Sequence, residues 1–220
     1  MSGSSTTLQT LRQLLAERFP QAPRTSGGSH PTGVAGIDAV LGGGLPAGRL
    51  TELVSARPSS GGQSVLSRLL CETRIARGRV ALVDGSDAFD PSAVPPDCLR
   101  HLIWVRCGDC SRAFAAADIL VRDGNYAVVA LDLRGLDECA LRRTPPSVWH
   151  RLQRAAEAGG AAVLVQTEFP LAPAVPARLV LEEMLPLSAA LRTRAEIAAA
   201  MEPGQARSPR RLGGREQRAG

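Results

Sequence analysis

The sequence predicts an α/β protein in which a doubly wound, mainly parallel sheet carries helices on both faces. Four apolar runs of strand length lie at 48–54, 79–84, 126–132 and 161–167, and segments with a helical pattern separate them. This alternation is typical of parallel sheets, because helices cover both faces of every strand. A turn rich in serine and glycine follows the first run and precedes a helix. A strand, a glycine-rich turn and a helix in that order present backbone N–H groups to a phosphate.

The remaining elements follow from periodicity and from residues that end a helix. Helices are predicted at 6–19, 64–77, 111–121, 145–158 and 187–201, and further strands at 99–105 and, as an edge strand, 177–181. Leu8, Leu11 and Leu15 share one face of the first helix. Trp149 and Leu152 lie on the apolar face of the helix at 145–158, which two glycines end.

The composition is consistent with one domain and two tails. The chain has 220 residues, 44% of them hydrophobic, which is enough for one sizeable core. We divide it into an N-terminal helix and linker (1–30), a core (31–201) and an arginine-rich tail of disordered composition (202–220). No apolar run reaches the roughly 18 residues of a membrane span, and no secretory signal is visible. Five unevenly spaced cysteines indicate free thiols, so we expect a cytoplasmic protein and no membrane partner.

The segment 31–48 has the most specific pattern in the chain. It reads Pro-Thr-Gly-Val-Ala-Gly-Ile-Asp-Ala-Val-Leu-Gly-Gly-Gly-Leu-Pro-Ala-Gly and leads into the first buried strand. It resembles the RecA recombinase family, in which Thr-Gly-x-x-x-Leu-Asp-x-x-Leu-Gly-Gly-Gly-Leu-Pro-x-Gly precedes the phosphate loop. The resemblance implies a RecA-like P-loop NTPase core over 31–181. A leading helix packs on a neighbouring protomer in that family, so the helix at 6–19 could do so or fold back on its own core.

The phosphate loop departs from the family's pattern G-x-x-x-x-G-K-[ST]. One register aligns Ala56, Gly61, Gly62 and Gln63 with the two glycines, the lysine and the hydroxyl residue, and a second register is shifted by one residue, to Arg57, Gly62, Gln63 and Ser64. Neither register contains the lysine, because all 26 basic residues are arginine. The lysine binds the β- and γ-phosphates and the hydroxyl holds Mg²⁺. We therefore expect no required cofactor and at most weak binding of ATP with Mg²⁺, unless the segment is an ordinary Ser/Gly turn.

Two strand ends complete the candidate nucleotide site. By resemblance, Asp132 matches the aspartate beside Mg²⁺ and Gln166 matches the residue that senses the γ-phosphate, although each could simply be a polar residue that ends a strand. The degenerate site then comprises Ala56, Ser59, Ser60, Gly61, Gly62, Gln63, Ser64, Asp132 and Gln166.

The general base of the family is also missing. Asp84 ends the strand at 79–84, and by resemblance the base lies two residues later, where this chain has Ser86. A serine does not take a proton near pH 7, and Asp87 could replace the base only after a shift. Alternatively, 84–90 is a solvated exit from the strand. We assign no catalytic residue and expect no significant ATP hydrolysis.

The pair Cys107 and Cys110 has C-x-x-C spacing, which suits redox chemistry or half of a zinc site. No second pair exists, and His101 and His150 lack zinc-finger spacing. We expect no metal site. Instead, Cys107 is predicted at a buried strand end and Cys110 in the first turn of a helix.

The loops that would grip single-stranded DNA in a recombinase are short here. Segment 168–176 contains three prolines and no basic residue or glycine, and the loop after Asp132 is short, although it holds Arg134, Arg142 and Arg143. We therefore do not expect strand exchange.

Within the superfamily the chain looks most similar to the short RecA-like proteins of the ImuA type, also described as SulA-like. This likeness implies a non-catalytic accessory protein of DNA repair and damage-induced translesion mutagenesis in the bacterial nucleoid. Its implied partners are RecA, an ImuB-like Y-family polymerase homologue or an error-prone polymerase. The alternative is a weak ATP-binding, DNA-dependent ATPase of the RecA family.

The tail is the one strongly basic part of the sequence. From Gly204 onward, five arginines and one glutamate give a net charge of +4, out of +5 for the chain. We predict that any affinity for single-stranded DNA lies in this tail, unless the tail only keeps the protein soluble. About four phosphate contacts should give a log–log salt slope of roughly −3. Binding is measured at low salt with and without residues 204–220. Equal binding by the truncated chain contradicts the prediction and shifts attention to Arg134, Arg142 and Arg143.

Overall fold

The sheet at the centre of the protein matches the predicted fold class. The computed structural model describes residues 28–207 except 174, 187, 190 and 191. Seven strands have the order β5-β4-β6-β7-β3-β8-β9. All neighbours are parallel except β8 and β9. The strands are β3 (Leu50–Ser55), β4 (Val80–Asp84), β5 (Leu102–Arg106), β6 (Val128–Asp132), β7 (Ala162–Thr167), β8 (Ala177–Leu181) and β9 (Gly204–Arg207). Separately, β1 (Ser29–His30) pairs with β2 (Leu45–Pro46).

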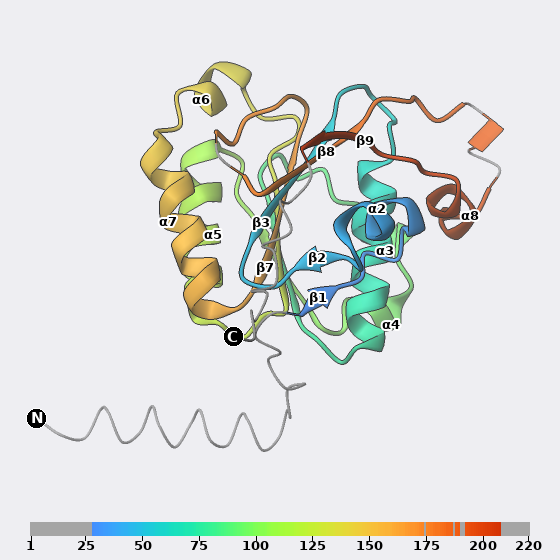
Figure 1. The fold of residues 1–220 in the computed structure, drawn as a ribbon, viewed down its shortest axis with the longest axis horizontal. Helices are drawn as coiled ribbons and strands as arrows, with labels where there is room; N and C mark the ends of the chain where they lie inside the picture. The colour runs from blue at the N-terminus through green and yellow to red at the C-terminus, as the bar shows by residue number, and fades with distance from the viewer. Residues whose placement is uncertain (1–27, 174, 187, 190–191, 208–220) are drawn as a thin grey trace, which may run out of the picture.

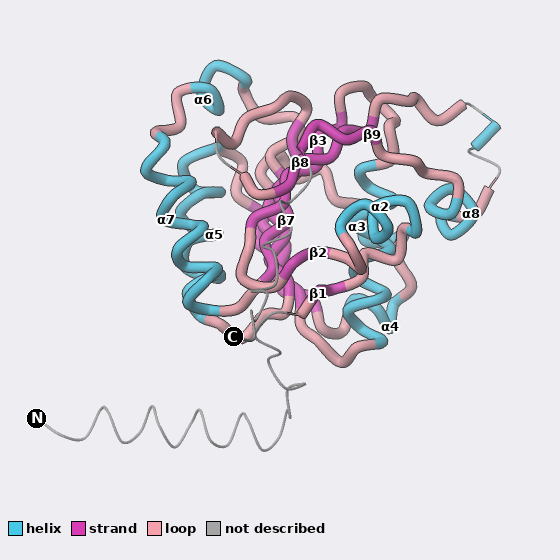
Figure 2. The backbone as a smooth tube through the Cα atoms, viewed as in Figure 1, coloured by secondary structure: helices cyan, strands magenta, loops and turns pink. Residues whose placement is uncertain are grey.

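Helices cover both faces of the sheet, as Figures 1 and 2 show. One face carries α5 (Cys110–Asp123), α6 (Glu138–Arg142) and α7 (Pro146–Gly159). The other face carries α2 (Ala35–Leu41), α3 (Gly62–Ile75), α4 (Pro96–Leu99) and α8 (Arg194–Ala199). A short 3₁₀ turn, η1, spans Pro91–Ala93.

The alternation of side chains along each strand explains why the strands are apolar throughout. In β4, Ala81 and Val83 pack with α5 and α7, whereas Val80 and Leu82 pack with α3. Successive side chains of a strand point to opposite faces, and here both faces are covered. All five residues of β4 are therefore buried, which confirms the prediction of a buried strand.

The parallel register brings three polar strand ends into one row. Asp84 of β4 is the register partner of Asp132 of β6, and Asp132 is the register partner of Gln166 of β7. Because β3 also ends at this edge, the turn between β3 and α3 lies beside the row. The carboxyl ends of strands in an open parallel sheet form the crevice where such proteins bind ligands.

Three predicted elements differ from the structure by more than small shifts at their ends. The strand predicted at 99–105 begins at Leu102, because prolines start the short helix α4 just before it. The strand at 177–181 is not an edge, since β9 pairs with it antiparallel. The single helix predicted at 187–201 contains only α8 as an α-helix among its described residues, because a capping box of Thr193 and Glu196 starts a new helix there.

Most residues at the two ends of the chain lie outside the part that the structure describes. The predicted helix at 6–19 and the tail from 208 fall outside the described residues. Disorder was predicted from residue 202 onward, which is wrong for Gly204–Arg207, because they form β9. A truncation that tests the tail without removing a strand should therefore begin at residue 208.

A buried carboxylate ties the loop at 168–176 to the sheet. Glu52 in β3 has no exposed surface and accepts hydrogen bonds from the backbone N–H groups of Leu171, at 2.7 Å, and Ala172, at 3.1 Å. It also forms an ion pair with Arg178 of β8, whose guanidinium donates to the carbonyl of Ala172. With the hydroxyl of Thr167, which donates at 3.4 Å, four residues donate hydrogen bonds to this carboxylate, as a buried charge requires.

We predict that Glu52→Gln lowers the free energy of unfolding by about 3–5 kcal/mol, because it leaves the guanidinium of Arg178 buried without its counter-charge. Urea denaturation measures the loss. The matched control is Glu138→Gln, which breaks a pair with Arg142 whose side chains are 58% and 57% exposed; this control should change stability by less than about 1 kcal/mol. Equal effects of the two substitutions would contradict the prediction.

Candidate functional site

The turn between β3 and α3 has the layout of an anion-binding turn. Gly61, just before α3, has a φ of 97°, a conformation that favours glycine. No side chain caps the helix at this end. The first N–H groups of a helix have no carbonyl one turn earlier to donate to, and they give its N-terminus a partial positive charge. Here the N–H of Ser64 donates to the carbonyl of Gly61 at 2.9 Å, so the donors directed out of the turn come from the residues before it. The helix has 14 residues, and it begins at Gly62, which one register aligns with the missing lysine.

A guanidinium occupies the space where a side chain at position 62 would begin. A methyl group built on Gly62 would lie 2.3 Å from Nη1 of Arg134 and 2.7 Å from Oγ of Ser55. Glycine is therefore required at this position for Arg134 to lie against the turn. A positive charge from the loop after β6 therefore lies against the first residue of α3.

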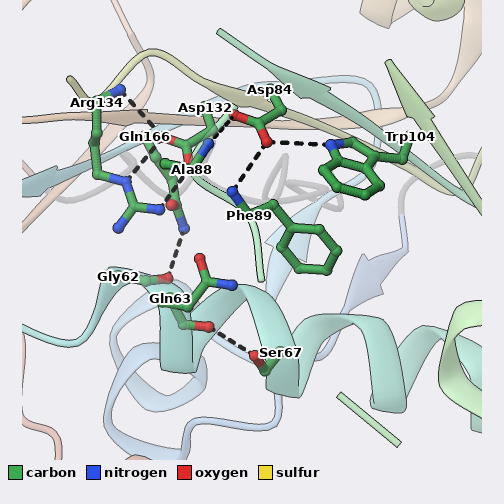
Figure 3. A network of polar contacts seen from close by, with 10 residues as sticks. All are labelled: Gly62, Gln63, Ser67, Asp84, Ala88, Phe89, Trp104, Asp132, Arg134 and Gln166. Carbon is green, nitrogen blue, oxygen red and sulfur yellow. Dashed lines mark hydrogen bonds and ion pairs between the residues drawn. The ribbon is translucent and has the colours of Figure 1, made fainter. Parts of the chain in front are cut away.

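Arg134 is held in this place by Asp132 (Figure 3). Its Nε donates to Oδ1 of Asp132 at 2.8 Å, its Nη2 donates to Oδ2, and its backbone N–H also donates to Oδ1, at 3.1 Å. The aspartate side chain is 3% exposed and the arginine side chain 19%. Bidentate pairs of this kind fix the orientation of the guanidinium. Burial by itself lowers the pKa of Arg134, but the hydrogen bonds and charge of Asp132 outweigh burial and raise it.

Asp84 organises the loop that follows β4. Its carboxylate accepts hydrogen bonds from the backbone N–H groups of Ala88 and Phe89, both at 3.0 Å, and from Nε1 of Trp104 at 3.1 Å (Figure 3). The residue has no exposed surface, so the alternative of a solvated strand exit is wrong for Asp84. Its role in this structure is to shape the loop at 85–89.

The position of the lost general base lies in the same cleft. Ser86 lines the cleft, and its Oγ is buried without a hydrogen-bond partner. Asp87 does not line the cleft and forms an exposed ion pair with Arg106. The hydrogen bond from Arg106 lowers the pKa of Asp87, which makes this carboxylate a weaker base.

Gln166 connects β7 to the turn. Its Nε2 donates to the carbonyl of Gly62 at 3.1 Å, whereas its Oε1 is buried without a partner. The side chain therefore links the end of β7 to the first residue of α3.

The cleft gathers polar atoms that lack partners. It has a volume of about 610 Å³, and its lining includes Ser55, Ser59, Ser60, Gly61, Gly62, Gln63, Ser64, Ser86 and Arg134. Five of the seven buried side-chain N and O atoms without a partner in the described residues belong to Ser55, Ser60, Gln63, Ser86 and Gln166. A buried polar group without a hydrogen bond costs about 1–3 kcal/mol. Such a concentration indicates a place where a polar ligand or water binds.

Most predicted site residues come together here. Of the nine predicted binding residues, the six at 59–64 line the cleft. Asp132 lies behind Arg134, and Gln166 contacts Gly62. Ala56 is exposed and does not line the cleft, because it lies where the chain leaves the buried strand β3 for the turn.

Sequence reasoning missed the role of Arg134, which was considered only as a DNA contact. The signal was the Asp-x-Arg spacing after an apolar strand. Its side chain is mostly buried, so it is not part of an exposed DNA surface. Arg142 is exposed, but it pairs with Glu138 and lies over the ring of Phe169 at 4.3 Å.

The cysteines have the predicted positions. Cys107 is buried after β5 and Cys110 begins α5. All five cysteines are free thiols. Among the described residues, no group of three or more histidine, cysteine or acidic side chains could hold a metal ion. None of the described helices has the length and apolar character that a membrane crossing requires.

The chain is similar to several RecA proteins. The chain is 34% identical to Protein RecA from Rubrobacter xylanophilus over 109 residues, which is 47% of this chain and 31% of that protein. It is 33% identical to Protein RecA from Crocosphaera subtropica over 118 residues, 52% and 33% of the two chains. It is 32% identical to the chloroplastic DNA repair protein recA homolog 1 from Arabidopsis thaliana over 105 residues, 46% and 23% of the two chains.

The comparison supports a distant relationship. No protein-family profile matches the chain. The chain spans about a third or less of the length of these curated relatives. Together with the mainly parallel sheet and its flanking helices, the similarity supports a place in the RecA superfamily.

We predict that Gly62→Ala lowers the free energy of unfolding by about 1–3 kcal/mol, because the new methyl group meets Arg134 and Ser55. In a chain that already carries Arg134→Ala, Gly62→Ala should lower the free energy of unfolding by a smaller amount. The two reductions should differ by at least about 0.5 kcal/mol, which is the coupling energy between the two residues. Thermal or urea unfolding of the four chains measures the cycle. Gly204→Ala is the control, because its nearest atom would be 3.5 Å away. Additive effects would show that the guanidinium does not press on Gly62.

Proposed function

We propose that this protein is a non-catalytic accessory protein of DNA repair, of the ImuA type, which acts by docking on other proteins of damage-induced translesion mutagenesis. The similarity to RecA proteins and to a chloroplast DNA repair protein, over about half of this chain, supports the repair context. The proposed partners are RecA, an ImuB-like Y-family polymerase homologue or an error-prone polymerase. The proposed place of action is the nucleoid in the cytoplasm.

The ion pair between Asp132 and Arg134 is the observation that carries the non-catalytic role. Phosphoryl transfer in a P-loop protein needs a lysine on the phosphates and Mg²⁺ held beside an aspartate. Here both oxygens of Asp132 accept hydrogen bonds from Arg134. A divalent cation could reach this carboxylate only if the buried ion pair were broken. The residues at this position therefore do not fit Mg²⁺.

The base position supports the same role. The hydroxyl of Ser86 does not take a proton from water near pH 7, and Asp87 is bound to Arg106 outside the cleft. Removing one electrostatic contributor from an active site lowers kcat by about 10²–10³. Loss of the lysine, the metal ligand and the base together disfavours the alternative, a weak DNA-dependent ATPase.

We expect turnover of ATP far below the order of 1 s⁻¹ typical of enzymes, with or without single-stranded DNA and Mg²⁺. Phosphate release by the full chain measures it, beside a RecA protein as positive control. Turnover near 1 s⁻¹ that disappears in Asp132→Asn would overturn the proposal. This variant keeps the shape of the side chain but loses one acceptor and the charge that pair with Arg134, so the loss of activity reports a catalytic carboxylate only if urea denaturation shows that the variant is folded.

A complementation test addresses the docking role. Deleting the gene should lower the frequency of damage-induced mutation, and both the wild-type chain and Asp132→Asn should restore it. Restoration by wild type alone, with Asp132→Asn present at the same level in the soluble fraction, would indicate that the carboxylate acts chemically.

A further inference from the structure

We propose that the turn at 59–63 and Arg134 form a phosphate-binding site that works without a divalent cation. Its ligand is a pyrophosphate-type anion, either free or as the phosphate end of a nucleotide. The inference goes beyond the accessory role and does not depend on which protein the chain docks on.

The donors for such an anion come from two elements that meet at Gly62. The uncapped N-terminus of α3 offers backbone N–H groups. Arg134 uses Nε and Nη2 on Asp132, while its Nη1 faces Gly62. A guanidinium has five N–H donors in a fixed plane. The donors of Nη1 therefore remain directed toward the turn while the carboxylate holds the other edge (Figure 3).

Buried hydroxyl groups provide independent evidence for a ligand. Ser55 is 6% exposed and Ser60 is 4% exposed, both line the cleft, and neither Oγ has a hydrogen-bond partner. Oγ of Ser86 and Nε2 of Gln63 are also buried without a hydrogen-bond partner, and both residues line the same cleft. Phosphate oxygens accept hydrogen bonds from hydroxyl, amide and backbone N–H groups alike. An anion on the turn would satisfy several of these atoms at once.

The charges around the cleft favour an anion. Its lining includes Arg57, Arg134 and Arg192 and one acidic residue, Glu168. Asp132 does not line the cleft, because Arg134 lies between it and the turn. The aspartate thus acts as a positioning residue for a cation that contacts the ligand. Since it is already paired, the site needs no metal ion to neutralise it.

The dimensions of the cleft also suit a ligand larger than a single water molecule. Its volume of about 610 Å³ lies within the range of small-molecule sites. The segment before β9 closes one side, where the backbone N–H of Leu185 donates to the carbonyl of Ser59 at 3.1 Å. Met201 packs on Gly61 from the same side, since a methyl group built there would lie 2.5 Å from its Cε.

Calorimetric titration of the full chain with pyrophosphate tests the proposal, once in EDTA and once in Mg²⁺. We expect binding in EDTA that is equal to, or tighter than, binding in Mg²⁺, because magnesium competes for the ligand. Binding that requires Mg²⁺, or no binding at millimolar pyrophosphate in either buffer, would overturn the proposal.

Two variants locate the binding. Ser60→Ala removes one unpartnered hydroxyl and should weaken binding about fivefold, and Arg134→Gln should weaken it at least tenfold. Ser60→Ala keeps the ion pair intact, so it remains informative if Arg134→Gln does not fold. Arg142→Gln, which removes an exposed arginine, is the matched control and should bind as wild type. Unchanged binding in Ser60→Ala, or equal weakening in the control, would overturn the site.

The source of the phosphate is distinguished by comparing pyrophosphate with ATP in EDTA. Equal affinities assign the site to an inorganic anion, and tighter binding of ATP assigns it to a nucleotide. Both results support a metal-independent site. Calorimetry measures binding independently of ATP turnover and of complementation. Failure to bind would therefore contradict the phosphate site but not the accessory role. Failed complementation would contradict the accessory role but not the phosphate site.

Discussion

The buried ion pair between Asp132 and Arg134 is the interaction on which the whole cleft depends. It places a guanidinium against the first residue of α3, and this arrangement requires glycine at position 62. A buried pair is costly to break from one side, because the remaining charge has no water to solvate it. The same contact supplies the turn with a cation and withholds a carboxylate from metal ions. In the site that we propose, one pair thus supplies a cation and occupies the carboxylate, and this arrangement suits binding of an anion.

Buried polar groups in this protein fall into two kinds, and the difference separates structure from function. Asp84 and Glu52 have no exposed surface, and each accepts hydrogen bonds from at least three donors. Their carboxylates fix loops at the carboxyl ends of the strands. The hydroxyls of Ser55 and Ser60 are almost as buried but have no partner. Because the first kind is complete within the chain and the second is not, only the second points to a ligand.

The arrangement of the sheet converts separate strand ends into one site. Asp84, Asp132 and Gln166 are far apart in the sequence but are register partners on adjacent strands. Strand β3 lies on the other side of β7, so the turn that follows β3 reaches the same edge. A shift of one residue in any of these strands would turn the polar end to the opposite face. The apolar faces of β4, β6 and β7, which are buried under helices, prevent this shift.

The sequence by itself determined the buried strands, most helices and the absence of a lysine from the turn before α3, because these depend on local residue type and spacing. Apolar runs bounded by glycine and proline identify β4, β6 and β7 without any knowledge of their neighbours. The tertiary structure decided the contacts between residues that are far apart in the sequence, which local patterns do not specify. The pairing of β9 with β8 depends on a strand brought back along the sheet after α8. The position of Arg134 against Gly62 joins residues 72 positions apart. Such a contact exists only after the sheet has formed, since the parallel register of β6 with its neighbours brings the guanidinium to the start of α3.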